Sequence, residues 1–200
     1  MKWLVVIAVI GRVAGADDRV LLAPTAELPD AGAVTASAEL DRHGTVGVRA
    51  TLGFGGLAQL AVEGVDQDST GHLVTTFRMG VPKVPVIAGL VKGETTTAYL
   101  VASESVGPAR FHAGGEAIAT TDKTIFRPLG GIEVVPPTFP KTTLLVDISW
   151  EPQLAFSWGV RYRALAWAAL ELAVRHDEAT FGDPDVFVRV TGYWDTVLSR

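Results

Sequence analysis

Cysteine is missing from this 200-residue chain, which excludes disulfide bridges, zinc sites built on thiolates and a lipid anchor on cysteine. Lysine is scarce, because 12 of the 17 basic residues are Arg. The net charge of −5 at pH 7 argues against nucleic acid as a partner. No apolar run reaches the ~18 residues of a membrane-spanning helix, yet a hydrophobic content of 48% excludes a disordered chain. The sequence therefore encodes a soluble domain, or a membrane protein in which apolar residues alternate with polar ones instead of forming long apolar runs.

The amino terminus has the pattern of an export signal. Lys2 precedes an apolar run from Trp3 to Ile10, and Ala14-Gly15-Ala16 places small residues where a signal peptidase cleaves. The run is too short for a transmembrane helix, and its other interpretation is a buried first strand. The predicted organisation is a signal peptide (1–16), a periplasmic amino-terminal segment (17–32) and one folded barrel domain (33–200).

The rest of the chain alternates apolar and polar residues with a period of two, which is the pattern of β-strands. From Val46 to Phe54 the even-numbered residues are apolar, and Gly55-Gly56 then provides a hairpin turn. Twelve segments are predicted as strands: Ala33–Leu40, Val46–Phe54, Leu57–Val65, Leu73–Val81, Val84–Val91, Thr97–Ser103, Ala109–Glu116, Ile125–Val135, Leu144–Glu151, Leu154–Arg163, Ala168–Arg175 and Val186–Trp194.

Two segments fit this scheme less well. Ala164 to Arg175 is rich in Ala and Leu and is the best candidate for a helix, although its spacing also fits a strand. Most Pro residues fall at predicted turns or strand ends, but Pro128 falls inside a predicted strand. It predicts a bulge or a shorter strand there.

The central question is which face of the sheet meets water, because a soluble barrel buries its apolar face and a membrane barrel encloses its polar face. Arg and acidic residues recur at mid-strand on the polar face, where they can pair inside a lumen, whereas four of the five Lys lie at turns or strand ends. The predicted lumen-lining residues are Arg49, Glu63, Arg78, Arg110, Glu133, Asp147, Arg161, Arg163, Glu171 and Arg189. The predicted membrane-interface aromatics are Phe54, Trp150, Tyr162 and Trp194.

The connections between strands also alternate. Polar, charged connections are separated by shorter ones, as outer loops and periplasmic turns are in membrane barrels, with Pro136–Lys141 as an exception. These patterns predict an all-β fold, a single antiparallel up-and-down transmembrane β-barrel of about 12 strands (range about 10–16), in the outer membrane of a Gram-negative bacterium. The alternative is a soluble secreted β-barrel or sandwich that binds an apolar ligand or a protein partner.

Two stretches resemble a known family. Leu22-Ala23-Pro24-Thr25-Ala26, followed by Leu28-Pro29-Asp30-Ala31-Gly32, is similar to the segment that leads into the first strand of YjbH-type outer-membrane proteins. Gly159-Val160-Arg161-Tyr162-Arg163 resembles their repeated strand phrases. Members are much longer, so the chain matches one barrel of such a protein. The resemblance implies a role in exopolysaccharide secretion, with polysaccharide as the transported polymer and a periplasmic polysaccharide-export protein as partner. Unlike typical outer-membrane barrels, the chain continues beyond its last aromatic residue, Trp194.

No motif predicts catalysis, a metal or a cofactor. The four His residues form neither an H-x-x-x-H nor an H-E-x-x-H pair. Ser103 and His112, and His176 beside Asp177, have no spacing that is typical of a hydrolase. The glycine pairs lack a following helix and Lys, so they are not phosphate loops. The sequence predicts a protein that is not an enzyme and needs no cofactor.

The expected barrel size limits the lumen. Eight strands leave an interior filled by side chains and sixteen leave a water channel, so about twelve predict a narrow or plugged lumen. Facing Arg and acidic side chains then either form ion-pair ladders that fill the barrel or line a passage for anionic or hydroxyl-rich solutes. The predicted function is a passive pore or translocon component for polysaccharide, surrounded by outer-membrane lipid. The alternative function for the same fold is a structural outer-membrane barrel with a blocked lumen.

Overall fold

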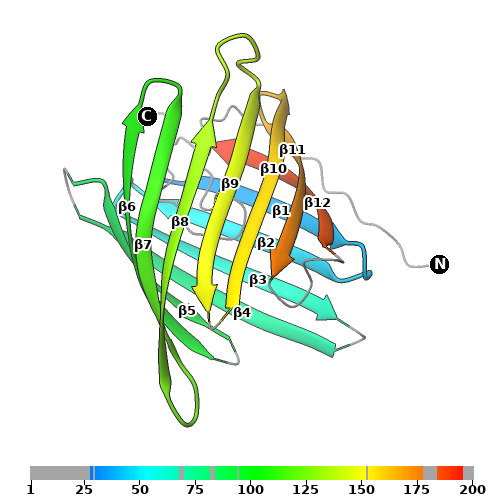
Figure 1. Ribbon diagram of the computed structural model, residues 1–200. Helices are drawn as coiled ribbons and strands as arrows, with labels where there is room; N and C mark the ends of the chain where they lie inside the picture. Colours follow the sequence, from blue (N-terminus) through cyan, green and yellow to red (C-terminus); the bar gives the residue numbers. More distant parts are fainter. Residues whose placement is uncertain are drawn as a thin grey trace.

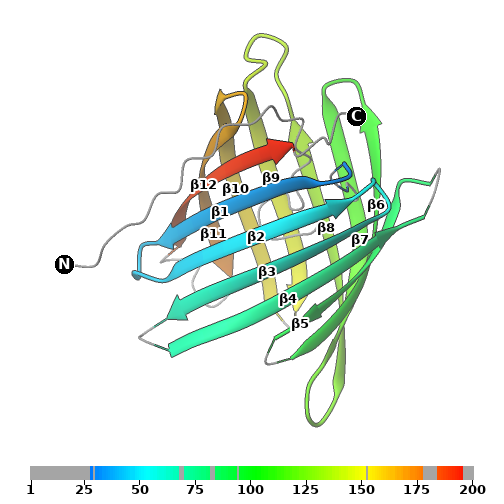
Figure 2. The same cartoon turned by 180° about the vertical axis from the view of Figure 1, so that it is seen from behind.

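A computed structural model of the chain describes residues 28, 30–67, 70–81, 84–93, 95–151, 153–177 and 184–195. They form twelve strands that close into one antiparallel barrel, as Figures 1 and 2 show from opposite sides. The strands are β1 (Ala33–Asp41), β2 (Val46–Phe54), β3 (Ala58–Gln67), β4 (Thr70–Gly80), β5 (Val86–Lys92), β6 (Thr96–Val106), β7 (Ala109–Ala119), β8 (Thr124–Val134), β9 (Thr142–Glu151), β10 (Gln153–Leu165), β11 (Ala168–Asp177) and β12 (Asp185–Asp195). The predicted antiparallel up-and-down barrel is confirmed.

Each strand pairs with its neighbours in the chain, and β1 closes the barrel by pairing with β12. Ala33 opposes Asp195 at one end of this closing pair and Asp41 opposes Phe187 at the other. Closure leaves no open sheet edge, so the inward-facing side chains are enclosed on all sides. No helix in the described part of the chain is long and apolar enough to span a bilayer.

The predicted boundaries at the amino terminus are only partly covered by the structure. The signal peptide predicted for residues 1–16 lies outside the described residues, as does most of the segment predicted for 17–32. The described part of that segment leads directly into β1, since the N–H of Gly32 donates to the carbonyl of Gly53 and Ala33 begins the strand. The signal peptide and the periplasmic segment remain predictions.

The turn at Gly55-Gly56 shows how the local sequence sets the register. Both glycines have positive φ, +68° and +67°, and the N–H of Leu57 donates to the carbonyl of Phe54. Positive φ is adopted readily by glycine, and the connection has three residues, Gly55 to Leu57, because Phe54 pairs with Ala58. The turn holds β2 against β3 with Arg49 directly opposite Glu63.

The two segments that fit the alternation less well are both strands in the structure. Ala164 to Arg175 forms no helix, because β10 ends at Leu165 and β11 begins at Ala168. Pro128 causes no bulge and does not end its strand, because β8 runs through it in continuous register with β7. The pairing of β8 with β9 starts just after the proline, at Leu129. Proline has no N–H to donate to a sheet, so it is tolerated where one side of the strand carries no partner.

The predicted alternation of the connections holds for polarity but not for length. Because consecutive strands run in opposite directions, every second connection lies at the same end, and the polar connections share one end of the barrel. Several of them are tight: β3 and β4 stay paired up to Gln67 and Thr70. At the opposite end, residues 135–141 form one of the longer connections (Figure 1).

Candidate functional site

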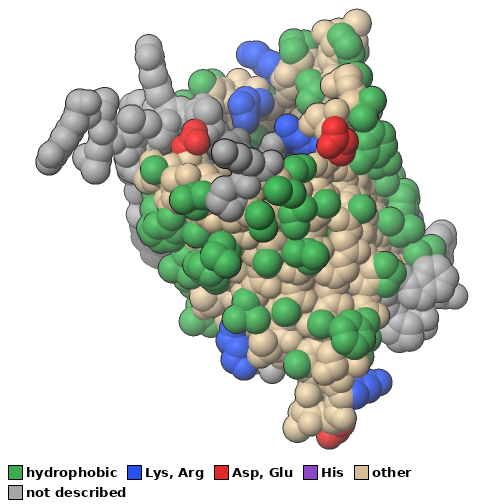
Figure 3. Space-filling model, turned by 90° about the vertical axis from the view of Figure 1, so that its left-hand side faces the viewer, with side chains coloured by type: hydrophobic (Ala, Val, Ile, Leu, Met, Phe, Trp, Pro, Cys, Tyr) green, Lys and Arg blue, Asp and Glu red, His purple; other side chains and the backbone are tan. Residues whose placement is uncertain are grey.

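The barrel has its polarity inverted relative to a soluble protein. Outward-facing apolar side chains are exposed, such as Leu100 at 56% and Leu172 at 54%, whereas inward-facing charged residues are buried, such as Arg78 at 1% and Glu171 at 2%. On the face in Figure 3, hydrophobic side chains cover the wall and charged side chains lie at its two ends. A folded chain hides its charges and exposes a closed apolar wall when the surrounding medium is itself apolar.

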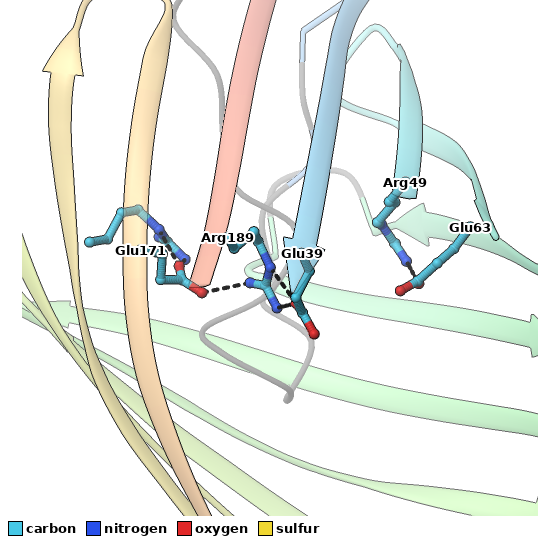
Figure 4. A network of polar contacts seen from close by, with 6 residues as sticks. Glu39, Arg49, Glu63, Glu171 and Arg189 are labelled. Atoms are coloured by element: carbon cyan, nitrogen blue, oxygen red, sulfur yellow. Dashed lines mark hydrogen bonds and ion pairs between the residues drawn. The ribbon is translucent and has the colours of Figure 1, made fainter. Parts of the chain in front are cut away.

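Arg189 on β12 is the centre of the charged part of the lumen. Its Nη1 lies 2.7 Å from Oε1 of Glu171 on β11, and its Nη2 lies 2.7 Å from Oε2 of Glu39 on β1. Figure 4 shows Arg189 held between these two carboxylates from neighbouring strands. The guanidinium is thus neutralised on both sides by charge-assisted hydrogen bonds, which are stronger than neutral ones.

The chain of ion pairs continues around the wall. Glu171 also binds Arg161 on β10, with Nη2 to Oε2 at 2.9 Å. Arg161 lies 3.8 Å from Glu133 on β8, which lies 4.0 Å from Arg110 on β7. We call the set Glu39, Arg189, Glu171, Arg161, Glu133 and Arg110 the ion-pair ladder.

Strand register explains why these pairs form. Arg189 stands directly opposite Glu171 on one neighbouring strand and Glu39 on the other. Arg161 stands opposite Glu171, and Arg110 opposite Glu133. Directly opposite residues on one face of an antiparallel pair have Cβ atoms about 4.5–5.5 Å apart, so opposite charges meet without strain.

Two further pairs follow the same rule outside the ladder. Arg49 donates through Nη1 to Oε2 of Glu63 at 2.9 Å, across β2 and β3. Arg127 on β8 donates to Glu116 directly opposite on β7. The lumen therefore holds its positive charge largely in register with negative charge, and the two nearly cancel.

A second part of the inner wall is held by apolar packing. Tyr99 and Val101 on β6 form a buried cluster with Leu129 on β8. Gly114 on β7 stands directly between Val101 and Leu129, and a side chain there would collide with the carbonyl oxygen of Leu100. The missing side chain lets the strands come close and the apolar groups meet across it.

Tyr99 fills a second gap of this kind. It stands directly opposite Gly89 on β5, and its ring occupies the space that a Cβ at Gly89 would need. Aromatic rings commonly cover a strand glycine in this way and lie flat against the wall. We call the inner face formed by Gly89, Gly114, Tyr99, Val101 and Leu129 the glycine-notched wall.

All ten residues predicted to line the lumen lie on the inner face. Seven of them form the ion pairs described above: Arg49, Glu63, Arg110, Glu133, Arg161, Glu171 and Arg189. Arg163 lies near the end of β10 with its guanidinium 5.4 Å from the centre of the Tyr193 ring. Arg78 donates to Gln59 at 3.1 Å, and Asp147 is buried at 4% exposure. Whether they line a conducting path stays a prediction.

The predicted set of lumen-lining residues omits several inward-facing polar residues. They are Glu39, Gln59, His112, Glu116 and Arg127. Glu116 on β7 and Arg127 on β8 stand opposite each other, and Glu39 on β1 stands opposite Arg189 on β12. Their signal is pairing rather than periodicity, because each stands opposite a counter-charge once the register is known.

The predicted interface aromatics occupy strand ends where the structure describes them. Phe54 is the last residue of β2 and Tyr162 is close to the end of β10, and both are 46% exposed on the outer face. Trp194 is the penultimate residue of β12, and its ring lies over Gly192. The side chain of Trp150 lies outside the described residues. The placement of these aromatic residues at the membrane interface stays a prediction.

The described residues contain no group of three or more His, Asp or Glu that could hold a metal ion. The strand pairing does bring Ser103 and His112 together, with Oγ hydrogen bonded to Nδ1. The other ring nitrogen, Nε2 of His112, has no hydrogen-bond partner. In this the pair differs from a Ser-His-Asp triad, in which the second ring nitrogen donates to a carboxylate.

No protein-family model and no curated protein matches the chain. Solved structures of outer-membrane porins do. A KdgM porin has a TM-score of 0.65 at 9% identity over 82% of this chain and 98% of that one. A NanC porin has a TM-score of 0.62 at 7% identity over 81% and 99%. The Acinetobacter baumannii outer membrane protein Omp33 has a TM-score of 0.50 at 10% identity over 85% and 100%. The chain has the fold of an outer-membrane porin.

Proposed function

We propose that the protein is an outer-membrane pore that conducts small hydroxyl-rich solutes passively. The observation that carries the proposal is the inverted polarity of a closed barrel, with Arg189 and Glu171 enclosed and Leu100 exposed. An apolar outer wall is stable in lipid, and an inner wall of paired charges is stable beside water. The shared fold with porins, which are channels rather than enzymes, supports the same reading.

The membrane part of the proposal is tested by a charge on the outer wall. Leu100 lies in the middle of β6 and is 56% exposed, whereas Val106 ends the same strand and is 61% exposed. We expect Leu100→Arg to destabilise the folded barrel in lipid vesicles by about 2–4 kcal/mol, and Val106→Arg by about 0–1 kcal/mol. The measurement is the free energy of urea unfolding, followed by gel mobility without boiling.

The two variants form a matched pair, because each adds one Arg to an exposed outward position of one strand. A soluble barrel, the alternative in which the outer face meets water or a partner, predicts no depth dependence. Equal effects of the two substitutions, together with protein that stays in the soluble fraction, would reject the membrane location.

The transport part is tested by conductance. Purified protein inserted into a planar lipid bilayer should give discrete current steps in potassium chloride. Heat-denatured protein from the same preparation is the control. An absence of steps from protein that migrates as a folded barrel would reject the pore.

The finer form of the proposal is export of polysaccharide with a periplasmic partner. Its support is the resemblance to YjbH-type proteins and a KdgM porin solved in complex with disordered oligogalacturonate. Deletion of the coding sequence should lower the polysaccharide released from the cells, and the intact chain should restore it. Unchanged release would limit the protein to a general pore.

A structural barrel with a blocked lumen is the second candidate. It is favoured by the low exposure of the inward-facing side chains, such as 0% for Gln59, 1% for Arg78 and 1% for Ser157. Side chains this inaccessible leave little free space between them. The same bilayer experiment decides, because a blocked barrel inserts and folds without conducting.

A further inference from the structure

The residues just before β1 turn the chain toward the neighbouring strands. The N–H of Ala33 donates to the carbonyl of Asp30 at 3.1 Å, and Gly32 between them has a positive φ of +75°. Glycine adopts a positive φ at the third position of a turn without strain. The N–H of Gly32 also donates to the carbonyl of Gly53 on β2 at 2.9 Å. The turn is therefore fixed to the end of β2.

Leu28 reaches the inner face of β4. Gly80 is the last residue of β4 and follows the inward-facing Arg78 by two positions, so a side chain at Gly80 would point into the lumen. A Cβ at Gly80 would lie 2.9 Å from Cδ1 of Leu28. The side chain of Leu28 thus occupies the space that a side chain at Gly80 would need. Because β2 and β3 separate β1 from β4 (Figure 2), the contact joins parts of the barrel wall that the sheet does not pair.

Both partners of this contact are anchored by backbone hydrogen bonds. The N–H of Gly80 donates to the carbonyl of Leu57, in the connection between β2 and β3, at 2.8 Å. Leu28 lies just before the turn that is fixed to the end of β2 through Gly32. The contact is therefore held from two sides, and the missing side chain at Gly80 leaves room for Leu28.

The lumen is tighter at the end where Leu28 lies. The inward-facing residues toward this end of β2 to β5 include four that are at most 4% exposed: Thr51, Gln59, Arg78 and Ile87. Toward the other end of the same strands, the inward-facing residues are half-buried, as at Gly47, Val65, His72 and Val91. A solute that crosses the barrel meets the least accessible stretch of these strands beside Leu28.

We infer that Leu28 is the constriction of the pore and sets the largest solute that passes. Its methyl groups neither donate nor accept hydrogen bonds, so they restrict passage by size and by excluding water, as apolar constrictions do in channels. Because Leu28 precedes β1, a change of its side chain leaves every strand pairing in place. This inference rests on the proposed pore and deepens it by naming the side chain that fixes its size limit.

The first experiment compares Leu28→Ala with Leu60→Ala in a planar lipid bilayer. Leu60 faces outward on β3 and is 38% exposed, so the control removes the same atoms outside the lumen. We expect Leu28→Ala to raise the single-channel current about twofold, because the open area at the narrowest point limits conduction. Leu60→Ala should carry the same current as the wild type.

The size limit itself is measured with the same three proteins by polymer exclusion. Polyethylene glycols of graded size are added to the bath, and each polymer that enters the pore reduces the ion current. We expect Leu28→Ala to admit larger polymers than the wild type does, and Leu60→Ala to admit the same ones. A size limit that stays the same in Leu28→Ala would overturn the assignment.

The second experiment uses the absence of cysteine, since Leu28→Cys would carry the only thiol of the chain. A methanethiosulfonate reagent with a trimethylammonium group adds bulk to this thiol through a mixed disulfide. We expect the single-channel current to fall by about half after the reagent and to return with dithiothreitol, which removes the adduct. Leu60→Cys is the control, and its current should not change. A current of Leu28→Cys that is unchanged, although mass spectrometry shows the adduct, would overturn the assignment.

The failures are distinguishable. A current that is the same in the wild type and in well-folded Leu28→Ala would leave the pore intact and overturn the constriction. Equal increases in Leu28→Ala and Leu60→Ala would also overturn the constriction, because the effect would not come from the lumen. A folded, inserted wild-type barrel that carries no current would overturn the pore, and the constriction with it. Folding of each variant is checked by gel mobility before and after boiling.

Discussion

The ion-pair ladder and the glycine-notched wall enclose the same lumen by different physical means. In the ladder, buried charges such as Arg189 and Glu171 satisfy one another across strands, and register alone brings them together. In the notched wall, Gly89 and Gly114 have no side chains, and Tyr99 and Val101 fill the space with apolar groups. The ladder is thus fixed by electrostatics and the notched wall by packing.

The difference between the ladder and the notched wall indicates which part of the lumen can select between solutes. Charges that neutralise each other in register form a stiff wall with little net field. The glycine-notched wall carries no charge, so it acts on a solute through its shape rather than through a field. Substitutions in the ladder should therefore change mainly stability, and substitutions in the glycine-notched wall should change conduction as well.

The largest effect is expected at Glu171, which binds two arginines and is 2% exposed. Glu171→Gln would remove the carboxylate that Arg161 and Arg189 share, so each buried guanidinium would lose one of its two negative partners. We expect the free energy of unfolding in lipid vesicles to fall by about 3–5 kcal/mol, as when one partner of a buried pair is removed.

The matched control for that prediction is Glu104→Gln. Glu104 is an exposed residue of β6, so neutralising it removes a carboxylate of the same kind outside the lumen. Its unfolding free energy should stay within about 0.5 kcal/mol of the wild type. Equal losses in the two variants would mean that the ladder does not stabilise the barrel.

An intermediate effect is expected in the notched wall. Gly89→Val would push the Tyr99 ring off the wall and into the lumen, because a Cβ at Gly89 needs the space that the ring occupies. We expect a loss of about 1–3 kcal/mol from overpacking, together with a lower single-channel conductance. The measurement is urea unfolding on one sample and bilayer current on another.

Gly64→Val is the control for this substitution, because a Cβ at Gly64 would meet nothing within 4 Å. A double variant with Tyr99→Ala should recover conductance, since the displaced ring is then gone. Conductance that remains normal in Gly89→Val would show that the Tyr99 ring does not border the conducting path.

The comparison also explains what the sequence could and could not predict. The alternation around Arg49 and Arg161 was sufficient for the strands and the inner face, because a period of two survives without knowledge of the partners. The ladder as a connected set was not predictable, since Glu39 and Arg189 are 150 residues apart and meet only when β1 closes on β12. Nor was the contact between Ser103 and His112, because it depends on the register of β6 against β7.

The smallest effect is expected for the Arg49–Glu63 pair, which tests whether the ladder is more than a sum of pairs. Its side chains are 10% and 20% exposed, and Glu63 stands directly opposite Arg49 across β2 and β3. Glu63→Gln should therefore lower the unfolding free energy by about 1 kcal/mol, and 1 M salt should halve the loss, because partly exposed pairs are screened.

Glu171→Gln should respond less to salt, since its partners Arg161 and Arg189 are more deeply enclosed. The ratio between the two losses, measured in the same vesicles at two salt concentrations, separates a connected ladder from isolated pairs. If Glu63→Gln cost as much as Glu171→Gln and with the same salt dependence, each carboxylate would stabilise only its own arginine. The ladder would then differ from the other charged pairs of the lumen only in how deeply its side chains are buried.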